Sequence, residues 1–245
     1  MRIALFGGTF DPVHLGHLAV ARVAADRFRL DRVFFVPADI PPHKQKRKLT
    51  DFQHRFAMLA LATAEDRRFV PSLLDAHTGA PNYSVETVRR LKNMVAKSDK
   101  IYFLIGMDAF RDIGTWRQPV QLLGECDFIV AARPGHSLGD VGRALPQAIR
   151  PPEAELRALA RQASGTIVLP KATIHLLSEV RERVSSTQVR AAAHKPVKYL
   201  SRYLPRLVAE YVKKEHLYVD SPAVAEPGGA PRGKVLSFHR SGKNA

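Results

Sequence analysis

Short apolar runs alternate with segments of helical spacing along most of the chain. Apolar runs that end at Pro, Gly or charged residues are typical of buried strands. They predict strands at 3–6, 33–37, 69–74, 101–105, 128–132 and 174–177. Helical spacing or a capping pattern predicts helices at 18–24, 52–64, 84–95, 153–163 and 204–214, and one that opens at 184–188.

This alternation favours an α/β fold, with a doubly wound, mainly parallel Rossmann-like sheet and helices on both faces. The pattern loosens at 136–165, where we expect a variable insertion. From 219 to 245 the chain is rich in Pro, Gly, Ser and basic residues without periodicity, which predicts a disordered basic tail. Ligands of such sheets bind beyond the carboxyl ends of the strands.

The segment 7–17 joins the first predicted strand to the first predicted helix. Gly7 and Gly8 allow a tight turn and let a ligand approach the main chain. A helix that begins near His14 offers unpaired N–H groups and the positive end of its dipole, which suits a phosphate. His14 and His17 are three residues apart and so share one face of the first helical turn. The segment therefore predicts a site for a phosphorylated ligand.

Two plainer interpretations of the histidine pair are open, namely surface residues and zinc ligands. Zinc requires three or four nearby ligands, but only Asp11 is close in sequence. The single cysteine, Cys126, is remote, and the sequence therefore does not favour a metal site.

A second polar segment begins at Ser185. Ser185 and Gln188 have the spacing of a capping box, so the hydroxyls here could simply start a helix. Arg190 lies about one turn further on, where a guanidinium can reach an anion held at the start of that helix.

Together the two segments resemble the signatures of the nucleotidylyltransferase superfamily. In that superfamily a Gly-x-Phe-Asp-Pro turn leads into His-x-Gly-His, as at 8–17, and Ile-Ser-Ser-Thr-x-x-Arg follows later in the chain. This chain has Val184 in place of the Ile, a change that should leave the phosphate chemistry untouched.

Four further matches resemble the bacterial nicotinate-nucleotide adenylyltransferases within that superfamily. They are Pro41-Pro42-His43-Lys44, the Tyr-Ser-x-x-Thr segment at 83–87, Gly106-Met107-Asp108 and Trp116-Arg117. Each has a structural alternative, such as a solvated loop for Lys44, a helix cap for Asp108 or simple packing for Trp116. Their joint order favours function, and the resemblance covers 1–218 as one nucleotidylyltransferase domain.

The resemblance implies transfer of adenylyl from ATP to nicotinate mononucleotide, giving deamido-NAD and pyrophosphate. It implies that His14, His17, Lys44 and Arg190 carry the catalysis. It implies ATP contacts from Gly7, Gly8, Thr9, Phe10, Ser186 and Thr187. It implies acceptor contacts from Thr87, Gly106, Asp108, Trp116 and Arg117, with Trp116 stacked on the pyridine and the Thr87 hydroxyl donating to its carboxylate. Mg²⁺ is expected as a cofactor, carried by the phosphates rather than by a protein cage.

The chain is strongly basic, with 38 Lys and Arg against 23 Asp and Glu and a net charge of +15. That balance would suit nucleic acid. The basic residues are spread along the chain, however, without an RNA-binding or zinc-finger pattern, and attraction of ATP explains them equally well. An RNA-binding protein and an enzyme that uses nicotinamide mononucleotide are the two alternatives, and nucleic acid is not favoured.

The single cysteine fits a reducing compartment, and no apolar stretch is long enough to cross a bilayer. The N-terminus runs directly into the first predicted strand without a signal peptide. These features predict a cytoplasmic protein with no membrane partner. The oligomeric state stays open, and a homo-oligomer is one of the states allowed.

Overall fold

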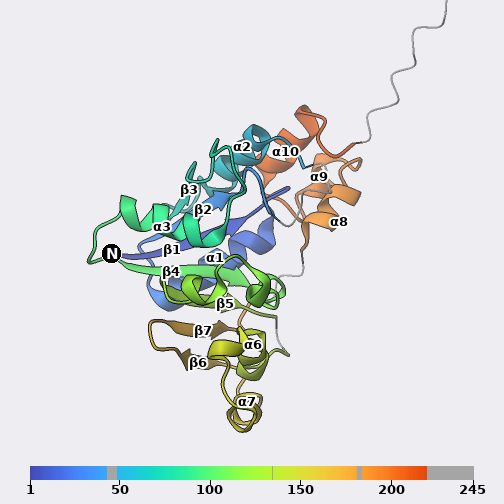
Figure 1. The fold of residues 1–245 in the computed structure, drawn as a ribbon. Helices are drawn as coiled ribbons and strands as arrows, with labels where there is room; N and C mark the ends of the chain where they lie inside the picture. Colours follow the sequence, from blue (N-terminus) through green and yellow to red (C-terminus); the bar gives the residue numbers. More distant parts are fainter. Residues whose placement is uncertain (43–48, 134, 181–183, 220–245) are drawn as a thin grey trace, which may run out of the picture.

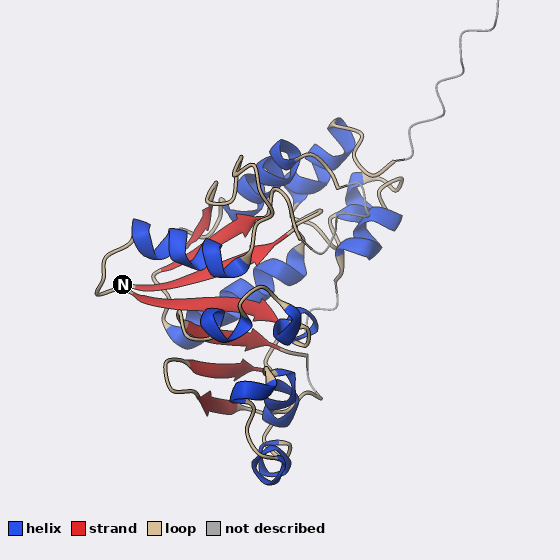
Figure 2. Cartoon of the chain, in the orientation of Figure 1, coloured by secondary structure: helices blue, strands red, loops and turns tan. Residues whose placement is uncertain are grey.

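The computed structural model of the chain describes residues 1–42, 49–133, 135–180 and 184–219. A twisted sheet of seven strands runs through the molecule, with helices on either side (Figures 1 and 2). The strands are β1 (Arg2–Gly8), β2 (Arg32–Pro37), β3 (Phe69–Pro71), β4 (Lys100–Gly106), β5 (Asp127–Ala131), β6 (Gly165–Val168) and β7 (Thr173–Leu177).

The strand order is β3-β2-β1-β4-β5-β7-β6, and every neighbouring pair is parallel except β6 with β7. The strand order reverses direction between β1 and β4, which are neighbours although β2 and β3 lie between them in sequence. In open α/β sheets, ligands bind at the carboxyl ends of the strands that flank such a switch point. The predicted doubly wound, mainly parallel sheet is confirmed.

Each face of the sheet has its own hydrophobic core, because alternate strand residues point to opposite faces. In β1, Ala4 and Phe6 belong to one core, whereas Ile3 and Leu5 belong to the other. The first core is covered by α1 (Leu15–Phe28), α2 (Phe52–Thr63), α8 (Ser186–Ala191), α9 (Val197–Leu200) and α10 (Arg206–Lys214). The second is covered by α3 (Ser84–Met94), α4 (Met107–Phe110), α5 (Pro119–Leu122), α6 (Leu138–Ala144) and α7 (Glu153–Leu159).

The segment 136–165 contains more structure than the one helix its sequence predicts. It forms α6, a short 3-10 turn and α7, which pack beside the β6–β7 edge (Figure 1). Gly139 and Gly142 make α6 look like a loop in the sequence, but they serve close packing. A Cβ at Gly139 would lie 2.7 Å from the Cα of Ala160, and one at Gly142 would lie 2.5 Å from the Cδ2 of Leu156.

Strand β6 was also not predicted. It is a four-residue edge strand with a single buried residue, Ile167, and Val168 is 77% exposed. A strand with so little burial carries almost no hydrophobic signal.

The described helices include none long and apolar enough to cross a membrane.

Candidate active site

Two cavities meet at the switch point of the sheet. One has a volume of about 290 Å³ and is lined by His14, His17 and Asp108; we call it the histidine cavity. The other has a volume of about 240 Å³ and is lined by Thr87 and Trp116; we call it the tryptophan cavity. Both include Gly7, Gly106 and Ala109, at the carboxyl ends of β1 and β4. Two ligands bound in these cavities would therefore face each other across two glycines.

The two histidines form the N-terminal cap of α1. The His17 N–H donates to Nδ1 of His14 at 3.3 Å, and the His14 N–H donates to Nδ1 of His17 at 3.2 Å. Because each Nδ1 accepts a hydrogen bond, the proton of each neutral ring must be on Nε2. The rings stack with centroids 3.7 Å apart. The His-x-x-His spacing thus fixes two neighbouring N–H donors at the start of a helix.

His14 is buried, with only 6% of its surface exposed. Burial lowers the pKa of His14 to about 4. The ring is therefore neutral at physiological pH, yet it remains a donor through Nε2. His17 lies edge-on to the rings of Phe6 and Phe10, which hold it in place from the sheet side.

Gly16 is required by this arrangement. A Cβ at Gly16 would lie 3.0 Å from Nδ1 of His14 and 3.2 Å from the carbonyl oxygen of Val184. Any side chain would push apart His14 and the segment that leads into α8. The glycine of the His-x-Gly-His motif therefore serves packing rather than backbone flexibility.

The tryptophan cavity holds two of the ATP contacts that the resemblance implies. Gly8 and Thr9 line this cavity and not the histidine cavity, whereas Gly7 lines both. The Phe10 side chain is 2% exposed and packs against Phe6 and Phe35 in the core. Phe10 lines neither cavity, and its ATP contact stays a prediction.

Trp116 forms one wall of the tryptophan cavity. It lies edge-on to the ring of Phe103, with centroids 6.4 Å apart, so that its ring is braced from the sheet. Arg117 faces a smaller adjacent cavity, where it lies over the ring of Tyr83 at 4.7 Å. Its Nε lies 3.7 Å from Glu86.

Thr87 is buried in a polar cluster in the wall of this cavity, which Asp75 also lines. Its hydroxyl donates to the carboxylate of Asp75, with oxygen distances of 2.9 and 3.0 Å. Arg90 donates both to Asp75 and to the Thr87 hydroxyl. Burial raises the pKa of Asp75, against the opposing effects of Arg90 and Thr87. The Thr87 proton is thus engaged with Asp75, so a bond to a ligand carboxylate requires the hydroxyl to turn.

The α8 motif contacts the glycine-rich turn directly. Ser185 caps the helix with Gln188, as its spacing predicts. The Ser186 hydroxyl donates to the carbonyl of Pro12 at 3.0 Å. Arg190 donates to the carbonyl of Asp11 at 2.6 Å and to the Thr187 hydroxyl at 2.9 Å. The motif therefore ties two segments distant in sequence into one unit, and the ATP contacts of Ser186, Thr187 and Arg190 stay predictions.

Asp108 and Lys44 are the remaining residues that the resemblance assigns to the site. The Asp108 side chain lines the histidine cavity and is 81% exposed, with Arg111 Nη1 3.9 Å away. Lys44 lies outside the described residues.

Sequence reasoning missed Arg133 and His136, which line the histidine cavity beyond the end of β5. A basic residue directly after a predicted parallel strand is a signal that could have found Arg133. It also missed Asp75 and Arg55, because neither belongs to a motif. Their roles depend on contacts between segments distant in sequence.

The fold and the site define a nucleotidyltransferase. The cytidylyltransferase-like family model matches residues 5–192. A relative from Thermoanaerobacter sp. (strain X514) is 35% identical over 89% of this chain and 94% of its own length. One from Geobacter sulfurreducens is 36% identical over 89% of this chain and 98% of its own. Both are named "probable nicotinate-nucleotide adenylyltransferase". The chain belongs to the nicotinate-nucleotide adenylyltransferase family.

Solved structures agree on the fold. The Plasmodium falciparum nicotinic acid mononucleotide adenylyltransferase in complex with NaAD superimposes with a TM-score of 0.64 at 18% identity, over 89% of this chain and 97% of that one. The same enzyme complexed with APC gives a TM-score of 0.62 at 18% identity, over 89% of this chain and 96% of that one.

Proposed function

We propose that this protein transfers the adenylyl group of ATP to nicotinate mononucleotide, releasing pyrophosphate. The observation that carries the proposal is the meeting of two cavities at Gly7 and Gly106. The histidine cavity offers ring donors and a helix N-terminus to the ATP phosphates. The tryptophan cavity offers an aromatic wall to the pyridine.

The reaction is an in-line displacement at the α-phosphorus of ATP. An oxygen of the nicotinate mononucleotide phosphate forms the new P–O bond, and the bond to pyrophosphate breaks. The attacking phosphate is already ionised at neutral pH, so no general base is required. Catalysis then depends on positioning and charge stabilisation, as in other phosphoryl transfers.

His14 and His17 stabilise the charge that develops during this transfer. Their Nε2–H groups are preorganised, since each Nδ1 is fixed by a main-chain N–H. A low pKa at His14 keeps this donor neutral, so it stabilises negative charge without exchanging a proton. By resemblance, Lys44 and Arg190 would add positive charge.

The acceptor would lie in the tryptophan cavity, with its pyridine against Trp116 and its phosphate near Thr9. Gly8 and Thr9 line this cavity and not the histidine cavity, so their main-chain N–H groups would serve the acceptor phosphate more than the ATP phosphates. Selectivity for the acid over the amide would depend on the Thr87 hydroxyl turning from Asp75 toward the nicotinate carboxylate.

Mg²⁺ would reach the site with ATP. Among the described residues, no group of three or more His, Cys, Asp or Glu side chains could hold a metal ion. Mg²⁺ at sites of phosphate chemistry is commonly held by phosphate and water oxygens, with few ligands from the protein. The bound ion would neutralise phosphate charge.

Pyrophosphate release from ATP and Mg²⁺ tests the proposal, with nicotinate mononucleotide and nicotinamide mononucleotide as separate acceptors. We expect fast release with the acid and little with the amide. Similar rates with both would retain adenylyl transfer and refute the acid preference. Release with neither would refute the proposed reaction.

A further inference from the structure

Arg55, on α2, is a fully buried cation behind the tryptophan cavity. Only 1% of its surface is exposed. A buried guanidinium is costly unless its N–H groups find acceptors. Burial lowers the pKa of Arg55, and the nearby carboxylates Asp11 and Asp39 oppose that shift.

The acceptors of Arg55 come from three segments. Nη1 donates to the carbonyls of Thr9 at 2.9 Å and Ala38 at 2.7 Å, and Nε donates to the carbonyl of Thr50 at 2.8 Å. Nη2 lies 3.5 Å from the carbonyl of Asp39. One side chain thus joins the glycine-rich turn after β1 to the chain that leaves β2 and to the start of α2.

The hydrogen bond from Arg55 to the Thr9 carbonyl sets the orientation of the peptide unit between Thr9 and Phe10. A trans peptide unit is planar, and its C=O and N–H point in opposite directions. Fixing the Thr9 carbonyl toward Arg55 therefore aims the N–H of Phe10 away from Arg55. Ala38 is fixed from both sides, because its own N–H donates to the carbonyl of Gly8 at 2.9 Å. Thr9 and Ala38 both line the tryptophan cavity and not the histidine cavity.

We propose that Arg55 is a positioning residue for the acceptor, which fixes the main-chain wall of the tryptophan cavity without touching substrate. This inference rests on the proposed function, since it assigns the tryptophan cavity to the acceptor. The asymmetry between the cavities makes it testable, because a loss of Arg55 affects acceptor binding more than ATP binding.

The test compares steady-state kinetics and thermal unfolding of the wild type, Arg55→Met and Arg55→Lys. We expect Arg55→Met to raise KM for nicotinate mononucleotide at least tenfold and KM for ATP less than threefold. Lysine keeps the charge, but one ammonium cannot span the carbonyls of Thr9 and Thr50. Arg55→Lys is therefore expected to show the same asymmetry at reduced size. Calorimetric titration of nicotinate mononucleotide in the absence of ATP provides a readout independent of turnover.

Arg150→Met is a control that also removes guanidinium-to-carbonyl hydrogen bonds, at an exposed position. Arg150 donates from Nε and Nη2 to the carbonyl of Leu145 at 3.0 and 2.8 Å, and it lines neither cavity. We expect its KM values to match those of the wild type.

Equal rises in both KM values, or wild-type KM values in a folded Arg55→Met or Arg55→Lys, would overturn the proposal. If Arg55→Met does not fold, Arg55→Lys decides, and a failure of Arg55→Lys to fold would show that Arg55 serves stability alone. These outcomes differ from failure of the proposed function, in which the wild type itself releases no pyrophosphate.

Discussion

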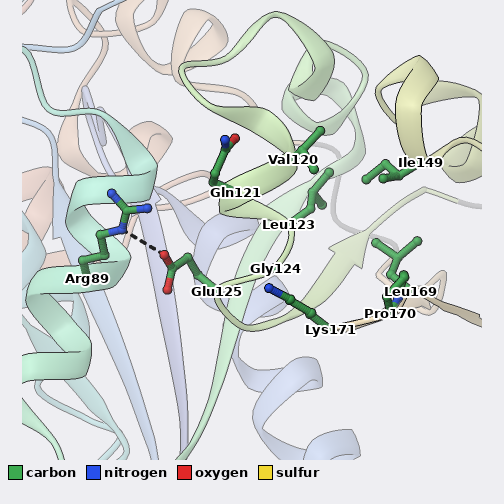
Figure 3. A pocket seen from close by; sticks show the side chains of 10 residues that line it. All are labelled: Arg89, Val120, Gln121, Leu123, Gly124, Glu125, Ile149, Leu169, Pro170 and Lys171. Atoms are coloured by element: carbon green, nitrogen blue, oxygen red, sulfur yellow. Dashed lines mark hydrogen bonds and ion pairs between the residues drawn. The ribbon is translucent and has the colours of Figure 1, made fainter.

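Cavity size and sheet topology favour different cavities, which lie at opposite ends of the sheet. The cavity in Figure 3 has a volume of about 460 Å³, larger than either cavity at the switch point. It lies by the amino ends of β5 and β7, lined by residues of the segment before β5 and of the β6–β7 turn. The two smaller cavities lie at the carboxyl ends of β1 and β4, where α/β sheets bind ligands.

The polar side chains of the Figure 3 cavity and of the histidine cavity also differ in their hydrogen bonding. In the Figure 3 cavity, Glu125 accepts from Arg89 at 2.8 Å, and Lys92 lies 2.8 Å from the same carboxylate. The Glu125 carboxylate is thus engaged by two cations of the protein itself. At the switch point, main-chain N–H groups bond to Nδ1 of His14 and His17, so each neutral ring carries its own N–H at Nε2. Topology and donor orientation therefore favour the switch point as the candidate active site, and substitutions at both ends of the sheet test this interpretation.

The largest effect is expected for His17→Ala. Loss of a preorganised donor should lower kcat by about 10²–10³-fold. Loss of one half of the α1 cap should cost about 1 kcal/mol of stability, which leaves the fold intact. Stopped assays of pyrophosphate release and circular dichroism separate the two effects.

Lys171→Ala is the counterpart in the Figure 3 cavity. It should leave kcat within about twofold of the wild type, as for a charge remote from the reaction. Near-normal turnover of His17→Ala, or a severe loss in Lys171→Ala, would reverse the assignment of the two ends.

Trp116→Ala should weaken the acceptor next most strongly. Loss of an aromatic stacking surface costs about 1–3 kcal/mol, or roughly 5- to 150-fold in affinity. KM for nicotinate mononucleotide should rise by that factor, while KM for ATP changes little. Leu169→Ala, which also removes an apolar wall but in the Figure 3 cavity, should change neither. An equal loss for both substrates in Trp116→Ala would remove Trp116 from the acceptor site.

Gly106→Ala tests whether the two substrates approach each other at Gly106, where the two cavities meet. A Cβ at Gly106 would meet no protein atom within 4 Å, so the fold should accept it. The methyl group would occupy space in which the two ligands face each other, and we expect kcat to fall on the order of tenfold. Gly124→Ala adds the same group in the Figure 3 cavity, where the Cβ would lie 3.4 Å from the carbonyl of Gln121. Unchanged kcat in Gly106→Ala would show that the substrates do not approach this glycine.

The features that the sequence predicted are those set by residues close to one another along the chain. Six strands are visible as apolar runs, and the helices α1, α2, α3, α7, α8 and α10 are visible as helical spacing or a capping pattern. The structure confirms a mainly parallel sheet. The short helices α4, α5, α6 and α9 were not predicted. The glycine-rich turn and the Ser185 cap were also recognisable, since their hydrogen bonds join residues three apart.

What the sequence did not predict depends on contacts between distant segments. The glycines of α6 resembled a loop until α7 was seen packed against them. Arg55 sits in an ordinary helical stretch, and only the folded chain brings the carbonyls of Thr9 and Ala38 to it. The bond from Thr87 to Asp75 likewise joins a motif residue to a loop residue with no motif of its own.

The last prediction concerns the pH dependence of stability rather than turnover, and compares the buried His14 at the switch point with the partly buried His175 on β7. Burial lowers the pKa of each, in the case of His14 from 6.5 to about 4. Between pH 6.5 and 4 the unfolded chain binds a proton at His14 that the folded chain does not, so stability must fall as pH falls through this window. The upper limit for His14 is about 1.4 kcal/mol per pH unit.

Urea unfolding at pH 7, 6 and 5 should show this slope in the wild type. The variant His14→Gln should flatten the slope. The variant His175→Gln should flatten it less, because His175 is more exposed than His14. An equal slope in wild type and His14→Gln would mean that His14 takes up its proton in the folded protein, and its neutral donor role would fail.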